Sequence, residues 1–151
     1  MKRYAWSHLN TQQVGAYAEY FVKMELTMYG FQVFQTEVDD RGIDFVARHG
    51  DQSFIEVQVK SLRANGYIFA RKEHFPFRAN LFMAVVLFTE GKVPSIFFIP
   101  ALAWQAPTSL LVNRDYDGLK SKPECGLNVS QKNMAALDQY RLENVVASLF
   151  G

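Results

Sequence analysis

Apolar residues near the start of the chain recur with the period of a helix. Between about Thr11 and Tyr29, one side of a helical wheel carries an apolar stripe, which predicts a helix packed against the rest of the protein. Asn10 or Thr11 can cap its first turn, and Gly30 ends it. Glu19 lies within this stripe, so the pattern places a carboxylate on the packed face of the helix. The apolar members of the stripe are Gly15, Ala18, Val22, Leu26 and Tyr29.

The next part of the chain has the pattern of β-strands. Two alternating segments flank residues 49–52 and predict a hairpin. A continuous apolar run further on suits a strand that is buried on both faces, and Pro100 stops the last predicted strand. The predicted strands are Phe31–Phe34, Ile43–Arg48, Ser53–Lys60, Leu81–Phe88 and Val93–Ile99.

Two stretches have no clear period. Residues 61–80 are predicted to be irregular, and residues 101–127 to combine short helical pieces with turns. Ser130 is a candidate N-cap for a helical C-terminus, whose apolar stripe shifts between Leu137 and Leu142, so that it forms one helix or two. The order of elements indicates an α/β fold with a mixed central β-sheet flanked by helices, in one domain spanning residues 1–151.

The composition of the chain limits the kinds of protein that it can be. The chain is 49% hydrophobic and has a net charge of +1, so it can build a core, and a nucleic-acid role must rest on a local basic patch. Its single cysteine, Cys125, excludes an intrachain disulfide and fits a reducing compartment. No apolar run has the length of a membrane span, and no signal sequence is visible. We therefore expect a cytoplasmic protein that does not act at a membrane.

The two strands of the predicted hairpin can be aligned by their apolar residues. A turn at Gly50-Asp51-Gln52 gives a register that buries one wholly apolar face, whereas a slip by one residue would destroy that face. The same register sets Asp44 opposite Gln58. Its other pairs are Phe45 with Val57, Ile43 with Val59 and Ala47 with Ile55.

This register gathers functional groups on the opposite face of the hairpin. Glu56, Gln58 and Lys60 alternate along one strand, and Asp44 joins them from the other. Carboxylate and amide oxygens suit a hard divalent cation such as Mg²⁺, and a neighbouring lysine can hold a phosphate and orient the attacking water. Each residue also has an ordinary interpretation, because a charged strand face is usually just solvated. The combination favours phosphodiester hydrolysis.

These residues resemble the motifs of the PD-(D/E)XK nuclease superfamily. The pattern Gly15-x3-Glu19-x2-Val22-x3-Leu26-x3-Gly30-Phe31 is similar to the first helix of archaeal-type Holliday junction resolvases and related nucleases. Ile43-Asp44-Phe45-Val46 resembles the strand that carries the family aspartate. Gln58-Val59-Lys60-Ser61 resembles the Gln-x-Lys variant of the (D/E)-x-Lys motif, known in Mrr-type restriction endonucleases and some intron-encoded homing endonucleases.

The resemblance covers about residues 12–100 and implies a restriction endonuclease-like fold. It implies that Asp44 is the main metal ligand, Glu19 a supporting ligand and Lys60 the catalytic lysine, with Gln58 at the usual acidic position. An amide there is a departure from the family pattern. Either Glu56 compensates as a ligand, or metal binding is weaker, or the chain is inactive.

Basic residues gather after this motif and are candidates for DNA contacts. Tyr67, Phe69, Phe75 and Phe77 are interleaved with them. His74 also lies among them and could act as a general base, although a lone histidine is a poor signal of catalysis. The alternative is a solvated loop whose aromatic rings enter the core. The predicted phosphate-binding residues are Arg63, Arg71, Lys72 and Arg78.

The leading hypothesis is an endodeoxyribonuclease that uses Mg²⁺, or Mn²⁺ in its place. It would cut double-stranded DNA as a homing, restriction-type or junction-resolving enzyme, in the form of a homodimer or higher homo-oligomer. The alternative is a non-catalytic DNA-binding module on the same fold. A third hypothesis, a protein that binds a partner through its aromatic surface, has no specific support.

Overall fold

The first helix begins and ends close to its predicted bounds in the computed structural model, which describes residues 2–37 and 41–151. Helix α1 (Thr11–Met28) starts with a capping box, because the Asn10 side chain accepts a hydrogen bond from the Gln13 amide and the Gln13 side chain accepts one from the Asn10 amide. Tyr29 is its C-cap, and Gly30 follows with a φ of +96°, a conformation that favours glycine.

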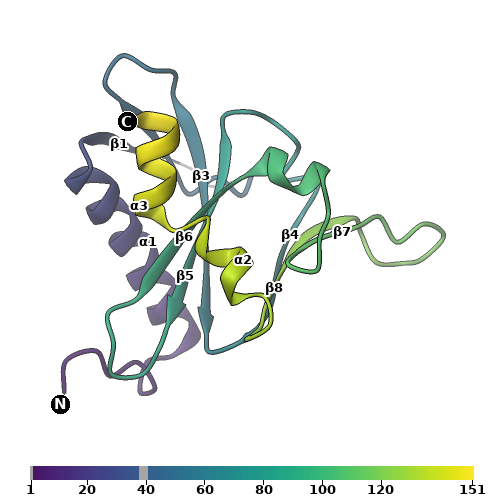
Figure 1. Cartoon of the computed structure of the whole chain (residues 1–151), viewed down its shortest axis with the longest axis horizontal. Helices are drawn as coiled ribbons and strands as arrows, with labels where there is room; N and C mark the ends of the chain where they lie inside the picture. The colour runs from purple at the N-terminus through teal and green to yellow at the C-terminus, as the bar shows by residue number, and fades with distance from the viewer. Residues whose placement is uncertain (1, 38–40) are drawn as a thin grey trace.

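The described residues form a mixed central sheet of five strands. Strands β3 (Ile55–Arg63) and β5 (Leu81–Phe88) are parallel, whereas the other neighbours in the sheet are antiparallel. Because helices cover one face of this mixed sheet, the predicted fold class is confirmed (Figure 1). In spatial order the strands are β1 (Phe31–Gln35), β2 (Phe45–His49), β3 (Ile55–Arg63), β5 (Leu81–Phe88) and β6 (Ser95–Pro100).

Strand β5 is apolar throughout because it contributes to two cores. Phe82, Ala84 and Val86 pack with α1 on one face of the sheet. The residues that alternate with them, such as Met83 and Val85, pack in a second cluster on the other face. Burial on both faces is the reason for the continuous apolar run in the sequence.

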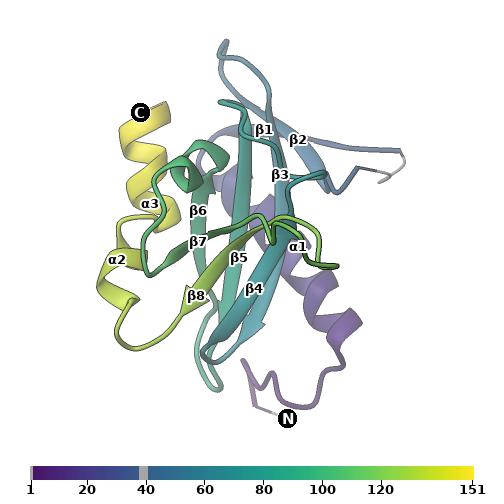
Figure 2. The ribbon, with the colours of Figure 1, turned by 90° about the vertical axis from the view of Figure 1, so that its right-hand side faces the viewer.

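A second sheet covers that other face, and the sequence analysis missed it. It contains β4 (Gly66–Arg71), β8 (Glu124–Val129) and β7 (Leu111–Arg114) in that order, all antiparallel (Figure 2). The prediction that residues 61–80 are irregular is therefore wrong for β4 and for the end of β3, and it holds for 72–80. The prediction for 101–127 holds for the short helix η1 (Ala101–Gln105) and for the turns between the strands, and it is wrong for β7 and β8. These strands were missed because they are short, bury one face and pair with partners far away in sequence.

The C-terminal region forms separate short helices, as the shift in its apolar stripe suggested. They are α2 (Met134–Asp138), α3 (Leu142–Val145) and η2 (Val146–Phe150), and the last two pack on the same face of the central sheet as α1. Ser130 is not the N-cap of α2, which is Asn133; Ser130 Oγ instead accepts a hydrogen bond from the Asn133 amide. Among the described residues, no helix has the length and apolar character needed to cross a bilayer.

Candidate active site

The β2–β3 hairpin has the predicted register. Phe45 pairs with Val57 and Ala47 with Ile55, and all four side chains are buried. The face of the hairpin that lies toward α1 is therefore apolar, as its alternation requires, and the polar residues of β3 lie on the opposite face.

Asp44 directly precedes β2, and it forms hydrogen bonds with the two residues that flank Gln58 in β3. Its amide donates to the Val57 carbonyl at 2.9 Å, and its Oδ2 accepts a hydrogen bond from the Val59 amide at 2.7 Å. A carboxylate that accepts a backbone hydrogen bond is held in one position. The predicted juxtaposition of Asp44 and Gln58 is thus present in the structure.

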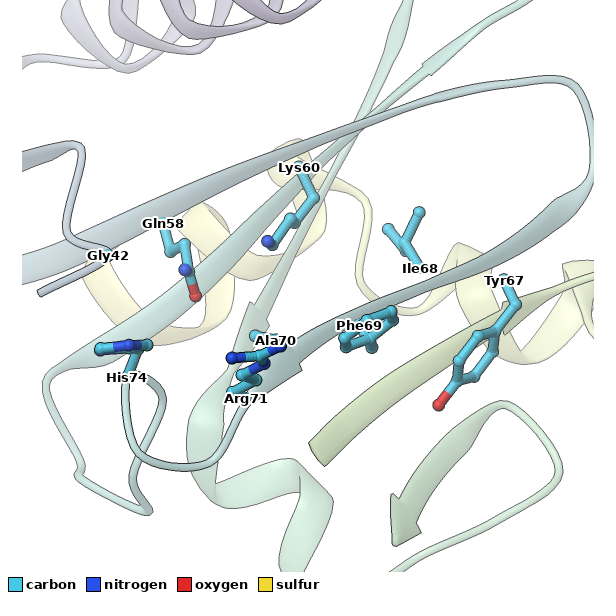
Figure 3. A pocket seen from close by; sticks show the side chains of 9 residues that line it. All are labelled: Gly42, Gln58, Lys60, Tyr67, Ile68, Phe69, Ala70, Arg71 and His74. Carbon is cyan, nitrogen blue, oxygen red and sulfur yellow. The ribbon is translucent and has the colours of Figure 1, made fainter. Parts of the chain in front are cut away.

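Gln58 and Lys60 line a cavity of about 490 Å³ between β3 and β4. Figure 3 shows both side chains entering it from β3, with Arg71 and His74 across from them. The opposite wall belongs to the second sheet and to the segment that follows β4. The lining residues are Gly42, Gln58, Lys60, Tyr67, Ile68, Phe69, Ala70, Arg71 and His74.

The amide of Gln58 is buried, and one of its polar atoms has no partner. Gln58 is 8% exposed, and its Oε1 accepts no hydrogen bond from the described residues. A buried oxygen without a partner is costly, so such atoms usually meet a water or an ion. Gly42 packs directly against this amide, because a Cβ there would lie 2.8 Å from Gln58 Nε2, and its φ of +76° also favours glycine.

Two effects act in opposite directions on the pKa of the Lys60 ammonium group. Burial lowers the pKa of Lys60 from its ordinary value, and the negative charge of Asp44 opposes this shift. Lys60 therefore loses its proton more easily than a lysine on the surface. It lies close enough to Asp44 for the two charges to interact.

Two solved structures that share this arrangement of elements are a Holliday junction resolvase and a homing endonuclease. Hjc, a Holliday junction resolvase from the archaeal hyperthermophile Archaeoglobus fulgidus, matches with a TM-score of 0.54 and 15% identity over 91% of this chain and 98% of its own. A bacterial homing endonuclease matches with a TM-score of 0.56 and 16% identity over 94% of both chains. The fold is restriction endonuclease-like. No family model and no curated protein sequence matches this chain.

The resemblance to PD-(D/E)XK nucleases inferred from the motifs is thus matched by the restriction endonuclease-like fold. At 15% and 16% identity the likeness shows the fold alone, so the chemistry of this chain has to be argued from its own residues.

Two oxygen donors of the site fit a divalent cation. The described residues contain no group of three or more His, Cys, Asp or Glu side chains placed around one point. Asp44 and Gln58 are adjacent, however, and the Gln58 oxygen is buried without a partner. Mg²⁺ is commonly held by one or two protein oxygens with water completing its shell, so these residues fit the ion.

The other two predicted carboxylates are engaged elsewhere. Glu19 forms an ion pair of 3.0 Å with Lys23 on α1, and it does not line the cavity. Glu56 pairs with Arg78 and lines a separate hollow together with Arg41 and Ile43. The structure thus brings Asp44, Gln58 and Lys60 together and places Glu19 and Glu56 in other contacts.

The four basic residues predicted to contact DNA lie in different surroundings in the structure. Arg71 lines the cavity. Arg63 donates to the carbonyls of Trp6 and Leu9, which ties the N-terminal segment to the end of β3. Lys72 forms an ion pair of 2.6 Å with Asp115, and Arg78 pairs with Glu56. Contact with DNA by these residues stays a prediction, and Arg71 has the placement that suits it best.

One cation near the cavity was missed by the sequence analysis. Arg114 of β7 lies over the Tyr67 ring at 5.2 Å, although the two residues are far apart in sequence. No local signal could have found it, because β7 itself was not predicted. His74 lines the cavity opposite Gln58 (Figure 3).

Proposed function

We propose that this protein is an endodeoxyribonuclease that hydrolyses DNA phosphodiester bonds with Mg²⁺, or with Mn²⁺ in its place. The observation that supports this most directly is the buried, unpartnered Oε1 of Gln58 beside Asp44 and in the same cavity as Lys60. The restriction endonuclease-like fold adds support, since both structural neighbours are DNA-acting enzymes.

Each residue of the site has a distinct task in this proposal. Asp44 and the Gln58 amide would hold the cation, which would stabilise the charge that develops on the phosphate and would lower the pKa of a water bound to it. Lys60 would contact the scissile phosphate and orient an attacking water, and its lowered pKa increases the fraction of neutral amine that is available to take up a proton. Arg71 and His74 face the same space from the opposite wall.

The first experiment is a cleavage assay on supercoiled plasmid and on a four-way DNA junction, each with Mg²⁺, Mn²⁺ and EDTA. Asp44→Ala and Lys60→Ala are the test variants. Asp51→Ala and Lys132→Ala are their matched controls, because both residues are exposed and lie outside the cavity. Activity that needs metal, vanishes in the test variants and persists in the controls supports the proposal. Equal activity in all five proteins contradicts it.

A second candidate function is a non-catalytic DNA-binding module. The amide at Gln58 and the absence of a three-carboxylate group among the described residues favour this alternative. Gln58→Glu separates the two. If the wild-type chain binds DNA without cutting and Gln58→Glu restores cleavage, the natural chain is a binding module. A wild-type chain that cuts rejects that alternative.

Further parts of the proposal concern assembly and location. Cutting both strands of a duplex with one site per chain takes two chains, so we expect a homodimer or higher homo-oligomer. Light scattering on the purified protein tests this. A cytoplasmic location agrees with the single cysteine, and fractionation of cells that express the protein tests it.

A further inference from the structure

We propose that the exposed face of β4 binds an unpaired nucleobase of the DNA, stacked on the ring of Phe69. This inference rests on the proposed function, in that the adjoining cavity is taken to hold a DNA phosphate. The expected substrate is DNA with an unpaired nucleotide next to the scissile phosphate.

Strand β4 presents aromatic rings to solvent beside Lys60. Tyr67, Phe69 and Arg71 alternate along one face, while Ile68 and Ala70 face the core. Phe69 is 45% exposed, and Figure 3 shows it between Arg71 and Tyr67 on the wall of the cavity. A large ring left exposed on a well-formed strand, next to a candidate catalytic lysine, is a surface suited to stacking.

The aromatic pair is held in place before any ligand arrives. The rings of Tyr67 and Phe69 are stacked, with their centroids 6.1 Å apart and an angle of 23° between their planes. The Tyr67 hydroxyl donates a hydrogen bond to the buried carboxylate of Glu124, and Arg114 covers the Tyr67 ring. Because these contacts fix the rings, stacking a base on Phe69 costs little conformational entropy.

Gly126 makes this arrangement possible. It lies opposite Phe69 in the β4–β8 ladder, and a side chain at this position would occupy the space of the Tyr67 ring. The ring therefore lies across β8 and extends the surface of the second sheet. A glycine at the centre of a strand is otherwise unfavourable, so its presence here indicates that the Tyr67 ring needs this space.

The charges around this surface suit a nucleotide. Lys60, Arg71 and His74 line the same cavity as Phe69, and Arg114 stands at the far end of the aromatic pair. A phosphate in the cavity and a base on Phe69 would thus be held together. Paired bases inside a duplex have both faces covered by their neighbours, so the free ring face of Phe69 favours an unpaired base.

The test measures binding of two labelled single strands in EDTA, so that neither is cut. One is an oligo-deoxythymidine of about twelve nucleotides, and the other is an abasic strand with the same number of phosphates. The proteins are wild type, Phe69→Ala, Phe69→Trp and Phe54→Ala. Phe54 is the matched control, because it is 44% exposed and lies outside the cavity.

We expect wild type and Phe54→Ala to bind the base-bearing strand more tightly than the abasic strand. Phe69→Ala should weaken binding of the base-bearing strand by about 5- to 150-fold, leave the abasic strand unaffected, and thereby remove the preference. Phe69→Trp should keep it, and unchanged binding of the abasic strand by Phe69→Ala shows that the alanine variant is folded.

Three results would overturn the inference: equal affinity of wild type for the two strands, equal losses in Phe69→Ala and Phe54→Ala, or no binding of either strand. The plasmid and junction assay separates this failure from failure of the proposed function. Metal-dependent cleavage without a base preference rejects the stacking surface alone. A base preference that depends on Phe69, without cleavage, rejects the nuclease and leaves a nucleic-acid-binding surface.

Discussion

Lys60 and Gln58 both sit in an environment that a purely structural residue would avoid. Gln58 buries an amide oxygen that no described residue hydrogen-bonds, and Lys60 is a cation whose charged form is disfavoured by burial. Polar groups kept in unfavourable surroundings reduce stability, and they gather at sites where the chemistry requires them. Two predictions belong at the scale of single residues.

The first concerns Lys60→Met. Because the pKa of Lys60 is lower in the folded protein than in the unfolded chain, the unfolded chain binds the proton more tightly and the charge destabilises the fold at neutral pH. We expect Lys60→Met to raise Tm by about 1–3 °C at pH 7 and to abolish cleavage. The gain should shrink as the pH rises from the lowered pKa toward the ordinary value of 10.5.

Thermal unfolding at several pH values measures this gain, with Lys132→Met as the control for an exposed lysine. A lower Tm for Lys60→Met at pH 7 would mean that the attraction of Asp44 outweighs burial, contrary to the expectation.

The second concerns Cys125, which is buried in the second core. Burial raises the pKa of its thiol to about 11, so very little thiolate is present near neutral pH. We expect the native protein to react with a thiol reagent at least about a hundredfold more slowly than the chain in concentrated guanidinium chloride. Similar rates in the two conditions would show that the second sheet opens readily.

At the scale of elements, the site is built between a hairpin and a separate sheet. The β2–β3 hairpin positions Asp44, Gln58 and Lys60, whereas β4 supplies the facing wall. The chain turns sharply from β3 into β4, with Ala64 at a φ of +66°. The shape of the cavity therefore depends on how the second sheet is held, and Tyr67 is part of that support.

Gly126→Ala tests this support. The added Cβ would displace the Tyr67 ring and leave the buried carboxylate of Glu124 without that hydrogen bond. We expect a loss of about 1–3 kcal/mol in the free energy of unfolding, measured by denaturant titration. Gly15→Ala is the control. A Cβ there meets no described atom within 4 Å, and the change should stabilise α1 by about 0.5–1 kcal/mol. A neutral Gly126→Ala would contradict the role given to Tyr67.

At the scale of the whole molecule, two cores share one central sheet. Alternate residues of β5 enter each core, so neither core can be lost without disturbing the strand that serves both. The two tryptophans of the chain divide between them, with Trp6 in the core beside α1 and Trp104 in the core under the second sheet.

This division allows a test of cooperativity. Trp6→Phe leaves Trp104 as the reporter of one core, and Trp104→Phe leaves Trp6 as the reporter of the other. Each variant is unfolded with denaturant and followed by both fluorescence and circular dichroism. We expect the two signals to give the same unfolding midpoint within each variant. A fluorescence midpoint that precedes the circular dichroism midpoint in Trp6→Phe would show that the second sheet unfolds on its own, against the prediction of a single domain.

The sequence by itself determined the parts of the protein that depend on short-range rules. The bounds of α1 follow from its cap and from Gly30, and the register of the hairpin follows from its alternating residues. The doubly buried strand follows from its continuous apolar run. Since Asp44, Gln58 and Lys60 all belong to that hairpin, their juxtaposition was predictable too.

Only the tertiary structure decided what surrounds these three residues. It paired Glu56 with Arg78, and it used Arg63 to hold the N-terminal segment. It also brought Tyr67 to Glu124, 57 residues away in the chain, and so formed the aromatic wall of the cavity. Such contacts leave no periodic trace in a sequence, because each depends on the relative placement of strands that pair only after the chain has folded.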